Sequence, residues 1–141
     1  MKLSTKTRYG LRALLDLARQ DGTLPVPLRE IAERQGLSEA YLEKLLGLLR
    51  RKGLVETVRG VQGGYRLATT ASNITVAQVL DVLDGPIRFS DCASGGHCRL
   101  REACPANSLW TRLQAGVEQV LRETTLEDLI NDSFASREGF E

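Results

Sequence analysis

The hydrophobic residues of the first half of the chain recur with the period of α-helices. A stripe at positions i, i+3, i+4 and i+7 predicts a helix over residues 4–19, and its members are Leu11, Leu14, Leu15 and Ala18. Further stripes predict helices over residues 28–35 and 39–52. Gly36 suits the end of the first of these, and Ser38 is placed to cap the second. A short helix, a tight turn containing glycine and a second helix form the pattern of a helix-turn-helix.

The helix predicted over residues 39–52 has two unlike faces. Its inner face is apolar and consists of Tyr41, Leu42, Leu45, Leu48 and Leu49. Its outer face is polar, carries small residues and ends in arginines, which suits insertion into the major groove of DNA. The alternative is the solvated face of an ordinary three-helix bundle. The candidate DNA contacts on this segment are Ser38, Glu39, Ala40, Glu43, Lys44, Arg50 and Arg51.

A hairpin is predicted directly after the helix-turn-helix. Residues 54–59 and 65–67 have strand-forming side chains and flank a glycine-rich tip. This order of elements is typical of a winged helix, whose wing can lie along the DNA backbone or minor groove. Further candidate DNA contacts are therefore Arg59, Gly60 and Gly63. A nucleotide-binding loop is the alternative, but the downstream Lys-Ser/Thr of a P-loop is missing.

The second half predicts three more helices. Thr75 and Gln78 have the spacing of a capping box for the first. The second, over residues 105–122, carries an apolar stripe of Leu109, Leu113, Val117, Val120 and Leu121, with Trp110 beside it. Such a helix outside a small DNA-binding domain favours a contact between two copies, although it could pack on its own chain. The third begins at residues 124–127 and is predicted to end near Ser133.

The charge of the chain divides between its two halves. Residues 1–70 carry thirteen Lys and Arg against seven Asp and Glu, and residues 71–141 carry six against eleven. A basic half indicates a polyanionic partner, although uneven surface charge alone would look the same. No apolar run approaches the roughly 20 residues of a membrane span, and the N-terminus turns polar at Lys2 and Ser4. We therefore expect a cytoplasmic protein with reduced cysteines and no membrane partner.

All three cysteines of the chain lie in one short segment. Cys92, Cys98 and Cys104 are separated by five residues each, and the segment also holds the single histidine, His97. An odd number of cysteines fits a disulfide framework poorly. Thiolates that lie this close together bind a metal, pair as a disulfide or fall together by chance, and the residues alone leave the choice open. A thiol switch through oxidation is one alternative, and a zinc site is another, although zinc favours a closer C-x₂₋₄-C pair.

These features in this order resemble the iron–sulfur cluster regulators, a family of bacterial winged-helix repressors with IscR-like and NsrR-like branches. The resemblance covers nearly the whole chain. It rests on the segments at residues 1–10, 31–38, 41–46, 48–55 and 59–67 and on the three cysteines, and the most specific part is Arg59-Gly-Val-Gln-Gly-Gly-Tyr65.

The resemblance implies a homodimer that binds double-stranded operator DNA and carries a cluster on Cys92, Cys98 and Cys104. Of the two common types, [2Fe–2S] is favoured over [4Fe–4S]. It also implies base contacts by Glu43 and a role for Arg59 in the wing. The chain departs from the family at the fourth ligand. The IscR branch has a histidine at the position of Asn107, and the nitric-oxide branch has a carboxylate in the region that here reads Thr7-Arg8-Tyr9. The candidates that remain are His97, Asn107, Asp91, Glu102 or solvent.

The expected architecture is mainly α-helical with a small β-hairpin wing and a long dimerisation helix. Residues 1–70 form the winged helix-turn-helix, residues 71–135 the cluster-binding loop and dimer helices, and residues 136–141 a flexible tail. The chain has no C-x-x-C motif and no Ser/His/Asp set, which argues against an enzyme. A cluster carrier that delivers its cluster to other proteins is a further alternative.

Overall fold

Three helices at the start of the chain begin and end as their capping residues predict. The computed structural model describes residues 3–20, 24–90, 99–100 and 102–139, with side chains up to residue 132. The helices are α1 (Thr5–Arg19), α2 (Leu28–Gln35) and α3 (Glu39–Arg51). The Ser4 and Ser38 hydroxyls accept from the backbone N–H groups of Thr7 and Tyr41, each at 3.2 Å. Gly36 ends α2 in the left-handed conformation, with φ of 67°. The predicted helix-turn-helix is confirmed, and α3 ends at Arg51, one residue earlier than expected.

A two-stranded antiparallel sheet follows α3 and forms the predicted hairpin. It consists of β1 (Val55–Val58) and β2 (Gly64–Leu67), with Val55 opposite Leu67. An additional bridge joins Val26, in the connection between α1 and α2, to Tyr65 of β2. The sequence did not predict this bridge, which fixes the hairpin to the helix-turn-helix.

The second half begins with a short 3₁₀ helix, η1 (Ala71–Asn73), and continues with α4 (Val76–Leu83), α5 (Asn107–Glu123) and α6 (Leu126–Gly139). The capping box of α4 is confirmed, since Thr75 and Gln78 bond each other's backbone N–H. The last helix is longer than predicted. Thr125 and Asp128 cap its start reciprocally, and no glycine or proline interrupts it before Gly139.

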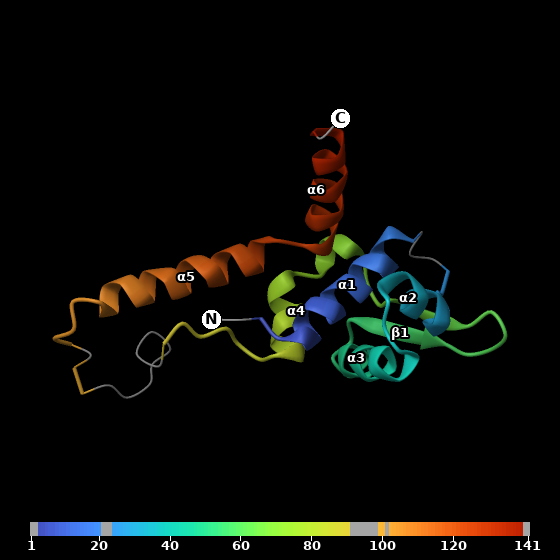
Figure 1. Cartoon of the computed structure of the whole chain (residues 1–141), viewed down its shortest axis with the longest axis horizontal. Coiled ribbons are helices and arrows are strands. Elements are labelled where there is room, and N and C mark those ends of the chain that lie inside the picture. Colours follow the sequence, from blue (N-terminus) through green and yellow to red (C-terminus); the bar gives the residue numbers. More distant parts are fainter. Residues whose placement is uncertain (1–2, 21–23, 91–98, 101, 140–141) are drawn as a thin grey trace.

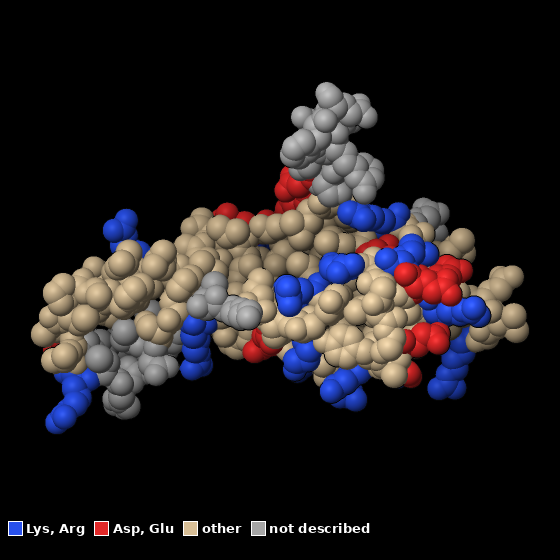
Figure 2. All heavy atoms as spheres, viewed as in Figure 1, with Lys and Arg blue, Asp and Glu red and all other residues tan. Residues whose placement is uncertain are grey.

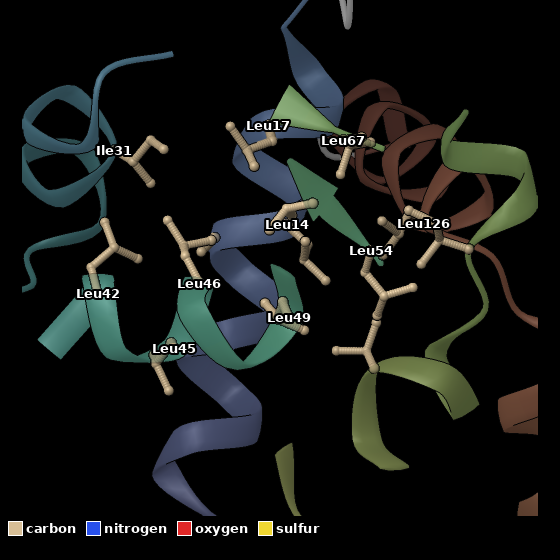
Figure 3. Close-up of a cluster of buried hydrophobic side chains, with 14 of the residues drawn as sticks. Leu14, Leu17, Ile31, Leu42, Leu45, Leu46, Leu49, Leu54, Leu67 and Leu126 are labelled. Atoms are coloured by element: carbon tan, nitrogen blue, oxygen red, sulfur yellow. The ribbon is translucent and has the colours of Figure 1, made fainter. Parts of the chain in front are cut away.

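The hydrophobic core draws on both halves of the chain (Figure 3). Leu14 and Leu17 of α1 meet the inner leucines of α3, which are Leu42, Leu45, Leu46 and Leu49. The predicted inner face of α3 did not include Leu46. Two residues that it did include, Tyr41 and Leu48, are only half-buried. Ile74 and Leu126 from the second half are fully buried in the same cluster. The helix-turn-helix therefore rests on a core that the second half completes.

Helix α5 differs from the other helices because much of its apolar stripe is exposed. It extends away from the body of the molecule (Figure 1). The exposed fractions are 48% for Leu109, 39% for Leu113 and 63% for Val120. Val117 and Leu121 of the same stripe are half-buried and α5 contacts α4, so both expectations for the stripe, a contact between copies and packing on its own chain, stay open. No helix in the described part of the chain is both long and apolar enough to span a bilayer.

Candidate functional site

The outer face of α3 is exposed and mixed in charge. Of the residues singled out in the sequence, seven lie at the surface of this element: Ser38, Glu39, Ala40, Glu43, Lys44, Arg50 and Arg51. Figure 2 shows lysine and arginine side chains along the lower edge of the molecule, over α3 and the hairpin, with acidic side chains between them. The four buried leucines on the opposite side fix the rotation of α3, so this face stays accessible to a partner.

A buried carboxylate holds α2, the first helix of the helix-turn-helix, against α1. Asp16 is 5% exposed and accepts from Arg34 at 2.7 Å (Nη2 to Oδ1) and 2.9 Å (Nε to Oδ2). The Gln35 side chain donates to the same carboxylate at 2.9 Å. The hydrogen bond to Asp16 raises the pKa of the Arg34 guanidinium, which stays charged. Because a bidentate pair fixes direction as well as distance, it sets the angle at which α2 presents the turn and α3.

An aromatic contact ties the start of α3 to α1. The rings of Tyr9 and Tyr41 meet edge to face, with centroids 6.3 Å apart and an angle of 87° between their planes. The Arg12 guanidinium lies 5.4 Å from the centre of the Tyr9 ring and also donates to the Gln35 side chain at 3.1 Å. Helix α3 is therefore positioned at its first turn as well as along its buried face.

The hairpin is anchored at its base and exposed at its tip. The N–H and C=O groups of Val26 and Tyr65 exchange hydrogen bonds of 2.7 and 2.8 Å. Gly64 permits this approach, because a Cβ atom there would lie 2.2 Å from the Val26 carbonyl oxygen. Arg59 and Gly60 are exposed at the tip and Gly63 is half-buried. The two arginines that flank the tip differ, since Arg66 pairs with Glu56 across the sheet.

The hairpin and the outer face of α3 lie within electrostatic reach of one another. Burial raises the pKa of the Tyr65 hydroxyl, the charge of Glu43 adds to the rise, and Arg50 opposes it. Two of the candidate DNA contacts on α3 thus influence a group in β2. Helix α3 also contacts β1, so the helix and the hairpin are neighbours in the fold.

Only one of the three cysteines falls in the described part of the chain. Cys104 is a free thiol, half-buried, and its carbonyl accepts from the N–H of Asn107 at 3.2 Å. The predicted ligands Cys92, Cys98 and His97 and the candidate Asp91 lie outside the described residues. Glu102 is exposed. Among the residues that the structure describes, no three His, Cys, Asp or Glu side chains come together at one point.

Asn107 carries an unusual side-chain oxygen. Its Oδ1 is buried and has no hydrogen-bond partner among the residues that the structure describes, one turn after Cys104 at the start of α5. Buried acceptors without a donor are rare in folded proteins because they lose their water without replacement. A thiol and an unpaired oxygen on one turn fit a metal-containing group, since both are electron-pair donors. The donors present here are therefore compatible with the cluster that the sequence indicates.

Sequence reasoning missed several residues that position the site. Asp16, Arg34 and Gln35 read as ordinary polar positions of amphipathic helices, and no local pattern marks them as partners. Gln114 of α5 was also missed, although it is the single buried residue of that helix. A polar residue on the inner side of an otherwise amphipathic helix is the signal that could have found it.

The fold and the exposed face of α3 define the class of protein, a winged helix-turn-helix regulator of transcription. Within this class the chain belongs to the Rrf2 family, described as iron-dependent transcriptional regulators, whose family model matches residues 3–132. The chain is thus a transcriptional regulator and not an enzyme.

Similar proteins include two named regulators. The HTH-type transcriptional regulator IscR of Klebsiella pneumoniae (strain 342) is 41% identical over 132 residues, which are 94% of this chain and 81% of that protein. The solved structure of T. potens IscR is 42% identical with a TM-score of 0.75, over 94% of this chain and 88% of its own. The structure of CymR (YrzC), the global cysteine regulator of B. subtilis, is 41% identical with a TM-score of 0.81, over 93% of this chain and 97% of the CymR chain.

Proposed function

We propose that this chain acts in the cytoplasm as a homodimer that binds operator DNA and responds to iron–sulfur or redox status through its three cysteines. The observation that carries the DNA-binding part is the exposed outer face of α3, which four buried leucines orient outward beside an anchored hairpin. Glu43 and Lys44 would face the base edges in the major groove, with Ser38, Glu39 and Ala40 at the entrance to it. Arg50, Arg51 and Arg59 would neutralise phosphates, and Gly60 and Gly63 allow the wing backbone to approach them.

The sensing part assigns Cys92, Cys98 and Cys104 as the thiolate ligands of a cluster, with [2Fe–2S] favoured. When bound, such a group supplies a redox-active, oxidant-sensitive centre. The unpaired Oδ1 of Asn107 favours this residue over His97 as the protein atom at the fourth position. An amide oxygen is a weak iron ligand, so the protein's own residues would hold the group less firmly here than a fourth cysteine or a histidine would.

The homodimer rests on the uncovered face of α5. Leu109, Leu113 and Val120 expose apolar surface along one side of a seventeen-residue helix. Two copies that joined α5 helices would bury this surface and would present two recognition helices to a two-fold operator. Sedimentation equilibrium tests this assignment. Leu113→Glu should shift the protein to monomer, whereas the exposed change Gln119→Glu should leave it dimeric.

A second candidate is a thiol switch that works without a cluster. The identity to CymR, the cysteine regulator, is 41%, close to the 42% identity to T. potens IscR. The free, half-buried thiol of Cys104 could respond to oxidants directly. In this candidate DNA binding would change on oxidation of the metal-free protein and would be restored by a thiol reductant.

One experiment separates the candidates. The protein is reconstituted anaerobically with iron and sulfide, its visible spectrum is recorded, and its affinity for its own promoter is measured with and without the cluster. Visible absorbance that Cys104→Ala loses, together with a change in affinity, supports the cluster sensor. Colourless protein whose affinity responds only to oxidant supports the thiol switch, and affinity that responds to neither overturns both.

A further inference from the structure

Gln114 stands out on α5 because it is polar and yet buried. Its exposed fraction is 6%, and it is the single buried residue of this helix. Residues on either side of it, Leu113 and Ala115, are exposed. An amide side chain is costly to bury unless its oxygen and its N–H groups all form hydrogen bonds.

All the amide groups of Gln114 are engaged. Its Oε1 accepts from the backbone N–H of Phe89 at 2.9 Å. Its Nε2 donates one hydrogen to the Ile87 carbonyl and the other to Glu118 Oε1 at 2.8 Å. The side chain thus bonds two backbone groups of segment 87–89, a carbonyl and an N–H two residues apart. We call this arrangement the Gln114 clasp.

The clasp joins α5 to the chain that enters the cysteine segment. Residues 87–89 leave α4 after Gly85 and Pro86, and Cys92 follows three residues beyond Phe89. The far end of the cysteine segment enters the same helix at Asn107, about two helical turns before Gln114. Both ends of the cysteine segment are thus held on α5. A rearrangement between these ends has to move α5 or break the clasp.

The surroundings of the clasp leave α5 room to move relative to α4. A cleft of about 250 Å³ lies between the two helices, lined by Leu80, Ile87, Glu118 and Leu121 among others. Where packing is incomplete, a directional hydrogen-bonded contact contributes more of the orientation than side-chain interlocking does. The clasp is therefore one of the contacts that set the angle of α5 on α4, together with the hydrogen bond from the Val76 N–H to the Thr124 carbonyl at the end of α5.

We propose that Gln114 is a positioning residue that couples the state of the cysteine segment to the angle of α5, and through α5 to operator affinity. The inference rests on the proposed function and adds to it the element that transmits the signal. In this proposal Gln114 serves neither as a cluster ligand nor as a DNA contact. Its effect runs through the backbone of residues 87–89.

The test compares Gln114→Leu with a matched control on the same helix. Leucine keeps most of the volume and removes all three hydrogen bonds. The control is Gln119→Leu, since Gln119 is exposed and bonds only Glu123, at 2.9 Å. Two readouts are recorded for each protein: the ratio of operator Kd values with and without the reconstituted cluster, and amide hydrogen exchange at Phe89.

Wild type should show a Kd ratio in the range typical of allosteric coupling, about 5–150-fold. Gln114→Leu should bring that ratio within about twofold of one while retaining the visible spectrum, and should accelerate exchange at Phe89. Gln119→Leu should leave both readouts as in wild type. A loaded Gln114→Leu protein that keeps the wild-type ratio overturns the coupling.

The remaining outcomes also decide. If wild-type protein itself shows a Kd ratio of one, the sensing function and the coupling are both overturned. If wild type shows a larger Kd ratio and Gln114→Leu keeps it, the coupling alone is overturned. If Gln114→Leu fails to fold, Gln114→Glu replaces it, because the carboxylate can still accept from Phe89 but cannot donate to Ile87. The Kd ratio of Gln114→Glu should lie between the wild-type ratio and a value of one. A ratio equal to that of wild type counts against the clasp.

Discussion

Arg34 of α2 donates two hydrogen bonds to the buried carboxylate of Asp16 of α1, one from Nη2 to Oδ1 at 2.7 Å and one from Nε to Oδ2 at 2.9 Å. The pair spans the two helices that precede the recognition helix. It is asymmetric, because the Asp16 side chain is 4% exposed and that of Arg34 is 40% exposed. The carboxylate therefore depends on the guanidinium more than the guanidinium depends on it.

Arg34→Ala should lower the free energy of unfolding by about 2–3 kcal/mol. Removing one partner of a fully buried pair costs about 3–5 kcal/mol, and the partial exposure of Arg34 places this pair below that range. Arg29→Ala is the matched control, since its pair with Glu33 on the same helix is exposed, and it should change stability by less than about 0.5 kcal/mol. Urea denaturation measures both, and equal effects of the two changes would contradict the role of Asp16.

Gly64→Ala should cost at least about 2 kcal/mol and should weaken operator binding. The new Cβ would lie 2.2 Å from the Val26 carbonyl oxygen, and the φ of 155° disfavours side chains, so the Val26–Tyr65 pair would open. Gly47→Ala is the control. A Cβ there meets nothing within 4 Å in the interior of α3, and alanine should stabilise the helix by about 0.5–1 kcal/mol. Thermal unfolding of the two variants should shift in opposite directions.

The start of α1 should contribute stability that acid removes. Hydrogen bonding by Ser4 first and by the Thr7 hydroxyl second lowers the pKa of the Asp84 carboxyl group, and the Ser4 backbone N–H donates to it at 3.3 Å. A lowered folded pKa means that the stabilisation is complete above the unfolded value of about 3.9 and is lost as pH falls through the folded value. Asp84→Asn should therefore flatten the acid limb of stability against pH. An acid limb as steep as that of wild type would show that Asp84 does not contribute.

Arg59→Ala should weaken operator binding and reduce the slope of log K against log salt concentration by about one. The reason is that Arg59 is exposed at the tip of the hairpin, where it can replace a counterion on a phosphate. Arg122→Ala, on α5, should leave the slope unchanged. Fluorescence anisotropy at several salt concentrations gives both slopes, and identical slopes for wild type and Arg59→Ala would remove the wing from the interface.

Asn107→His should make the reconstituted cluster persist longer in air, and Asn107→Ala should leave its lifetime unchanged or shorten it. Imidazole nitrogen binds iron better than an amide oxygen does. The side chain at position 107 already carries a buried oxygen that has no hydrogen-bond partner among the described residues. Visible absorbance followed over time measures the lifetimes. His97→Ala provides the comparison, and loss of the cluster in that variant alone would assign the fourth position to His97 instead.

The local features of this fold follow from sequence, whereas the contacts that orient them do not. Helix caps bond backbone groups only a few residues away, so a short stretch of sequence is enough to predict them. This holds for Ser4, Ser38, Thr75 and Gly36. Asp16 and Arg34 are brought together by the packing of two helices, and Thr7 meets Asp84 only after α4 has docked on α1. Gln114 likewise finds Ile87 and Phe89 through tertiary structure.

The same limit applies to the candidate site. The two faces of α3 and the hairpin could be predicted from periodicity and glycine content, because both are properties of short segments. The unpaired oxygen of Asn107 could not, since burial of one atom depends on everything packed around it. The length of α6 was underestimated because residues 136–139 are polar or glycine and continue no apolar stripe.

Leu126 of α6 is fully buried among side chains of the DNA-reading half, and Ile74, Val79 and Leu83 belong to the same core. Proteolytic cleavage near residue 70 would strip these side chains away and leave Leu14 and its neighbours without cover. The resulting fragment should unfold, because its core would be open to water. Cleavage between the two halves should therefore abolish the winged helix-turn-helix instead of releasing it as an independent domain.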